Sequence, residues 1–123
     1  MVTVTDEEFA DMAEKAFASL PKTHRDAVKN VAIVFADDPT PEQRVELKLR
    51  HDQTLFGLYQ GVALPRRQGV TNYPPDKITL FKGPLSRSVN SVDELQEQVR
   101  HTLWHEVAHY FGLGHEQIHK LER

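Results

Sequence analysis

Apolar residues recur at helical spacing near the start of the chain. Thr5-Asp6-Glu7-Glu8 has the form of a capping box, in which Thr5 is the N-cap and Glu8 bonds back to it. The apolar positions that follow are Phe9, Met12, Ala13, Ala16, Phe17 and Leu20. Because this spacing places them on one face, we predict an amphipathic first helix that ends near Pro21.

A second and longer helical pattern lies in the C-terminal half. It opens with another capping box, Ser91-Val92-Asp93-Glu94, and Gly112 is expected to end it because glycine adopts the left-handed conformation without penalty. Its apolar face consists of Val92, Leu95, Val99, Leu103, Val107 and Tyr110, and Trp104, Ala108 and Phe111 widen it. The pattern predicts a helix of roughly twenty residues.

Three apolar stretches between these helices predict strands. Residues 31–35 and 78–81 are short, apolar and partly β-branched runs, and residues 55–64 form a longer run that contains Gly57 and Gly61. Glycine inside a strand often marks a bulge or a close approach of another segment. Thr40-Pro41-Glu42-Gln43 predicts a short helix to about Leu49, and the polar segment 65–76 predicts a long exposed loop.

Composition narrows the possible classes of protein. A length of 123 residues fits one domain spanning 1–123, and the net charge of -3 gives no electrostatic reason to expect nucleic acid as a partner. No apolar run approaches the roughly 20 residues that span a bilayer, and the acidic start does not resemble a secretory signal. We therefore expect a cytoplasmic protein without a membrane partner, and leave its oligomeric state open. The chain has no cysteine, so any transition-metal site must use His, Asp and Glu.

The long helix carries His105-Glu106-Val107-Ala108-His109, an H-E-x-x-H motif. Residues i and i+4 lie one turn apart on one face, so His105 and His109 project two imidazoles that can hold one ion at about 2 Å. Glu106 lies one step round the helix, where it can reach a water on that ion and act as general base. The turn at Gly112 lets His115 return to the same ion. Three protein ligands and a water form the open coordination of a catalytic zinc.

The motif recurs as His115-Glu116-Gln117-Ile118-His119, close to the end of the sequence. His115 cannot easily serve two sites, and little chain remains to supply a third ligand. We therefore interpret the first motif as the metal site, and Glu116 and His119 as a solvated helical face. The alternative for the whole pattern is a core helix whose histidines are satisfied by hydrogen bonds.

The remaining histidines are expected to have other roles. His101 precedes His105 by one turn, but three ligands on one straight helix span about 12 Å, too far for one ion. We expect His101 to pack or to support a ligand, and His24 and His51 to lie on the surface.

The longer pattern His105-Glu106-x-x-His109-x-x-Gly112-x-x-His115 matches the extended zinc motif of metzincin-type metallopeptidases. From about residue 6 to 121, the chain more closely resembles the small bacterial zincin-like metallopeptidases often called minimal zincins, with support from segments 30–34, 39–42, 55–62 and 76–81. The resemblance implies a compact α+β fold with a small mixed sheet packed on the motif helix. It also implies His105, His109 and His115 as ligands of one Zn²⁺ and Glu106 as base.

The chain departs from larger metzincins because no methionine follows His115 to form their Met-turn, and members of the small type often have Asp at the third-ligand position. The activity we expect is zinc-dependent hydrolysis of a peptide or protein substrate, which adds to a sheet edge at 55–64 or 78–81. Two alternatives are a non-catalytic, metal-stabilised binding or regulatory module and a metal-dependent hydrolase of a non-peptide amide. The oxyanion stabiliser is open among four residues: Tyr59, Arg66, Arg67 and Tyr73.

Overall fold

The computed structural model describes residues 1–28, 31–50, 55–61 and 76–112. In chain order the elements are α1 (Asp6–Ala18), α2 (Lys22–Ala27), β1 (Val31–Ala36), α3 (Pro41–Glu46), β2 (Gly57–Gln60), β3 (Asp76–Phe81), α4 (Lys82–Arg87) and α5 (Val92–Tyr110). The strands form one sheet in the order β1-β3-β2, with β1 parallel and β2 antiparallel to β3. The predicted α+β class with a small mixed sheet is therefore confirmed.

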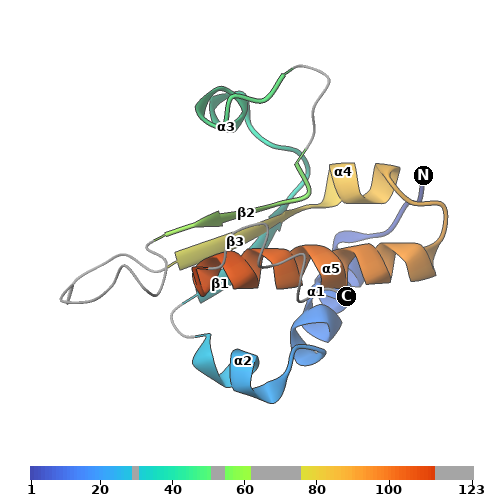
Figure 1. The fold of residues 1–123 in the computed structure, drawn as a ribbon. Coiled ribbons are helices and arrows are strands. Elements are labelled where there is room, and N and C mark those ends of the chain that lie inside the picture. The colour runs from blue at the N-terminus through green and yellow to red at the C-terminus, as the bar shows by residue number, and fades with distance from the viewer. Residues whose placement is uncertain (29–30, 51–54, 62–75, 113–123) are drawn as a thin grey trace.

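Helix α5 lies along the sheet and packs against β2 and β3 (Figure 1). Helix α1 packs against α5, and Figure 1 shows α3 projecting away from the rest of the fold. The residues of α5 that face this core are fully buried, among them Leu95, Val99, Leu103 and Val107. The motif helix is thus held by the sheet and by α1, which fixes the direction in which its histidines project.

The first helix begins as its sequence predicts. The backbone N–H of Glu8 donates to Thr5 Oγ1 at 3.1 Å, and the N–H of Thr5 donates to Glu8 Oε1 at 2.9 Å. The helix ends at Ala18, and Pro21 then serves as the N-cap of α2, a helix that the sequence pattern did not predict. The predicted first helix is confirmed.

Helix α5 starts with half of the predicted capping box. Ser91 Oγ accepts from the N–H of Glu94 at 3.1 Å, but Glu94 Oε2 accepts from the N–H of Asn90, not Ser91, at 3.2 Å. Val92 was predicted on the apolar face but is 53% exposed, because the buried face begins one turn later at Leu95. At the other end Gly112 has φ of 81°, the left-handed conformation predicted for it.

The remaining elements differ from prediction mainly in their lengths. Within the predicted strand 55–64 the structure assigns only Gly57–Gln60, and residues 62–64 lie outside the described chain. The expected loop 65–76 also lies outside it, except that Asp76 begins β3. Helix α3 ends at Glu46, before the predicted end at Leu49. Lys48, which follows the helix, has a φ of 56°. Within the described residues, no helix is both long and apolar enough to cross a membrane.

Candidate metal centre

Two imidazoles and one carboxylate meet near the C-terminal end of α5. The ring centroids of His105 and His109 are 4.9 Å apart, with 76° between the ring planes. One ligand atom from each of His105, Glu106 and His109 lies within 4.8 Å of the other two. The i, i+4 spacing therefore brings the predicted histidines together, and both are half-buried on the helix.

Glu106 occupies the buried side of this cluster and is only 7% exposed. Burial raises the pKa of its carboxyl to about 7, because the charged form loses its hydration, and a hydrogen bond with the backbone of Tyr59 opposes this in part. Without a bound cation, the group therefore exists at neutral pH as a mixture of acid and carboxylate. A group in that state can both accept and release a proton.

The close approach of β2 to α5 produces this burial. A Cβ atom built on Gly57 would lie 2.8 Å from Thr102 Cγ2 and 3.2 Å from Glu106 Cγ, so the site has no room for a side chain. The glycine in the predicted strand indicated such an approach, and the structure identifies α5 as the neighbouring segment.

A partly buried polar pair between β2 and β3 was not expected from the sequence. The hydroxyl of Tyr59 donates to Asp76 Oδ2 at 2.7 Å, and the Asp76 residue is 0% exposed. The Tyr59 ring also meets the ring of Tyr110 edge-on, with centroids 6.2 Å apart. Tyr59 was one candidate for the oxyanion stabiliser, but its hydroxyl proton is directed to Asp76. The other three candidates, Arg66, Arg67 and Tyr73, lie outside the described residues.

Several predicted sites concern histidines elsewhere. His115, the expected third ligand, lies outside the described residues, as do His51 and the second motif with Glu116 and His119. The structure corrects the expectation for His24, which is half-buried because its ring lies 5.4 Å from Trp104 and 5.5 Å from Phe111.

The donor set of the cluster fits a transition metal. Imidazole nitrogens and a carboxylate suit Zn²⁺ without a thiolate, and two histidines one turn apart are a common basis for such a site. The buried carboxylate also fits a nearby cation, because a positive charge stabilises its ionised form. His105, Glu106 and His109 are thus arranged to hold or to assist a metal ion.

The chain belongs to the zincin-like metallopeptidase family, whose model matches residues 28–123. Among solved structures, a conserved hypothetical protein from T. thermophilus has a similar fold, with a TM-score of 0.59 and 17% sequence identity. The match covers 88% of this chain and 94% of that protein. A search of curated proteins found no match.

Proposed function

We propose that this protein is a zinc-dependent metallopeptidase in which His105, His109 and His115 hold the ion and Glu106 is the general base. The observation that carries the proposal is the buried Glu106 carboxyl, with a pKa of about 7, beside two imidazoles on one helical turn. When bound, zinc supplies Lewis-acid polarisation of a carbonyl and lowers the pKa of a water. The family assignment supports the same chemistry.

Glu106 performs the proton transfers in this proposal. The carboxylate takes a proton from the attacking water and then gives it to the leaving amine, so that both steps use one group. A base is most effective when its pKa lies near the working pH, and burial raises the pKa of Glu106 in that direction from its usual value of 4.5. The hydrogen bond with the backbone of Tyr59 ties the carboxyl to β2.

The substrate lies along β2 in this proposal. The sequence left two strand segments open as the edge that receives an extended peptide, 55–64 and 78–81. Strand β3 is the central strand and pairs with β1 on one side and β2 on the other, so it has no edge to offer. Strand β2 is an outer strand of the described sheet and contains Gly57, where an added Cβ atom would lie 3.2 Å from Glu106 Cγ. Addition of a peptide strand there brings its backbone close to the base.

The test compares Glu106→Gln with a control on the same helix, Asp93→Asn, whose side chain is exposed in the first turn of α5. We expect Glu106→Gln to reduce cleavage of a peptide library by about 10²- to 10⁴-fold and to leave zinc content stoichiometric. Asp93→Asn is expected to keep both the cleavage activity and the zinc content of the wild type. Zinc is measured by elemental analysis and cleavage by mass spectrometry. Stoichiometric zinc in a wild-type protein that cuts no peptide would refute the proposal and favour a metal-stabilised binding module.

A further inference from the structure

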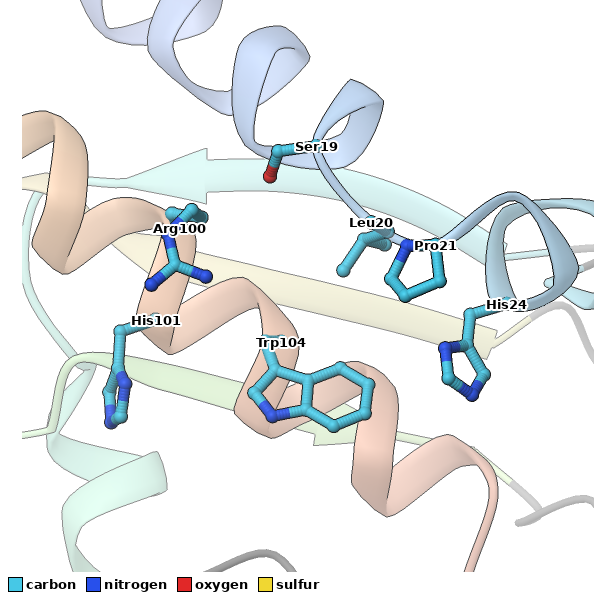
Figure 2. Close-up of a pocket in the computed structure, with 7 residues that line it drawn as sticks. All are labelled: Ser19, Leu20, Pro21, His24, Arg100, His101 and Trp104. Atoms are coloured by element: carbon cyan, nitrogen blue, oxygen red, sulfur yellow. The ribbon is translucent and has the colours of Figure 1, made fainter. Parts of the chain in front are cut away.

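A groove lies beside the candidate metal centre on another face of α5. Its cavity volume is about 420 Å³, within the range of sites that bind small ligands. Arg100, His101 and Trp104 of α5 form one wall, and Ser19, Leu20, Pro21 and His24 form the other. Figure 2 shows Arg100 and His101 at one end, His24 at the other end and the Trp104 ring between them.

The lining has a consistent chemical character. Among the described residues that line the groove, three are basic, Arg100, His101 and His24, and none is acidic, although the chain as a whole has a net charge of -3. Leu20, Pro21 and the indole of Trp104 supply apolar surface. Such a lining suits a ligand that combines a carboxylate with an apolar stem.

Arg100 is held at the mouth of the groove by a neighbour on the same helix. Its Nε and Nη2 atoms donate to the carboxylate of Glu97, whose side chain is 65% exposed, and Arg100 itself is 44% exposed. This pairing orients the planar guanidinium, which carries five N–H donors and matches carboxylates in geometry. Ser19, on the opposite wall, donates its hydroxyl to the carbonyl of Ala16 at 2.6 Å.

The groove is close enough to the metal pair to be reached by one substrate. His101 precedes His105 by four residues, which is about 6 Å along the helix. An extended peptide advances by about 3.3 to 3.6 Å per residue. A peptide whose scissile bond lies over His105 and His109, and which runs from there along α5 toward His101, therefore reaches the groove within two or three residues of that bond.

We propose that this groove is a subsite that binds a carboxylate of the substrate peptide, within two or three residues of the scissile bond, and that Arg100 and His101 determine this specificity. As a subsite it rests on the proposed peptidase function. The carboxylate comes either from an acidic side chain or from the peptide C-terminus, since both have the same chemistry.

Trp104 makes the test direct, because it is the chain's single tryptophan and lines the groove. Its fluorescence is titrated in full-length, zinc-loaded Glu106→Gln protein with three short peptides of otherwise identical sequence. The first has Glu and a C-terminal amide, the second has Gln and a C-terminal amide, and the third has Gln and a free C-terminus. We expect one of the two carboxylate peptides to bind about tenfold more tightly than the uncharged one. The tighter peptide identifies the source of the carboxylate.

When Arg100→Gln is combined with Glu106→Gln, the ratio of affinities for the carboxylate and uncharged peptides should fall to less than about threefold. Lys22→Gln is the matched control, since Lys22 is exposed, pairs with Asp26 and does not line the groove. It should keep the preference. Should Arg100→Gln fail to fold, His24→Gln on the facing wall provides the second variant. Equal binding of all three peptides, or a preference that survives Arg100→Gln, overturns the proposal.

The result is separable from the proposed function because the titration requires no cleavage. If the carboxylate preference is found but the wild type cleaves none of these peptides, the groove is a binding site and the peptidase proposal fails. If the wild type cleaves peptides without regard to charge and the titration shows no preference, only the groove proposal fails.

Discussion

The burial of Glu106 makes a quantitative prediction about stability and pH. Its carboxyl has a pKa of about 7 in the fold, against 4.5 as its reference value. A raised pKa means that the folded state favours the neutral acid. Below pH 4.5 the group therefore carries no penalty, between pH 4.5 and 7 the penalty grows, and above pH 7 it is constant. The rise from 4.5 to about 7 corresponds to a penalty of about 3 kcal/mol.

Glu106→Gln removes the charge and hence the penalty. In the presence of a chelator, we expect the variant and the wild type to have similar free energies of unfolding near pH 4. The variant should become more stable by up to about 3 kcal/mol at pH 8. Urea denaturation at pH 4, 5.5 and 8 measures this difference. The two proteins share all other titrating groups. The way in which the difference between their free energies of unfolding changes with pH therefore reports on residue 106 alone.

Glu97→Gln is a control whose effect on the free energy of unfolding should depend on pH in the opposite direction. The hydrogen bond from Arg100 lowers the pKa of Glu97, so the wild-type residue stabilises the fold at neutral pH and loses this effect as the pH falls through its lowered pKa. Zinc should also narrow the difference between wild type and Glu106→Gln at pH 8, because a cation favours the carboxylate. A difference that is independent of pH, or one that favours the wild type more as pH rises, would refute the assignment of Glu106 as a desolvated acid.

Two further substitutions test how the site is built. Gly57→Ala places a methyl group 2.8 Å from Thr102 Cγ2. We expect it to lower the free energy of unfolding by about 1–3 kcal/mol, measured by urea denaturation. An unchanged free energy of unfolding would show that β2 can move away from α5 at no cost. Tyr59→Phe removes the hydroxyl that donates to the buried Asp76 and should cost about 1–3 kcal/mol by the same measurement, whereas a loss below about 0.5 kcal/mol would mean that Asp76 does not depend on this donor.

The features that the sequence predicted depend on residues close together in the chain. The capping bonds of Thr5 with Glu8 and of Thr40 with Gln43 span three residues, and the imidazoles of His105 and His109 meet because they are four apart on one helix. Their geometry follows from helical periodicity alone, without knowledge of the tertiary fold. The candidate metal centre was predictable to this extent.

Two side-chain contacts were missed because they join segments that are distant in the sequence. Tyr59 and Asp76 meet through the pairing of β2 with β3, and His24 meets Trp104 across the gap between α2 and α5. Helix α4 was missed for a local reason. Gly83 and Pro84 are typical of a turn, yet they lie in the first turn of a helix, where proline is tolerated.

The energetics of Glu106 bear on function as well as on stability. Small domains are stable by about 5–15 kcal/mol, so a penalty of about 3 kcal/mol is a large fraction of what holds this fold together. A neutral residue at position 106 would remove this penalty. Strand β2 packs closely against Glu106, since a Cβ atom added to Gly57 would lie 3.2 Å from Glu106 Cγ. A residue that only filled space would not need a charge there. A carboxylate that assists a cation and exchanges a proton does need one, and strongly perturbed carboxyls are concentrated at such sites. This argument uses burial and charge alone, so it supports a functional role for the Glu106 carboxylate independently of the family assignment.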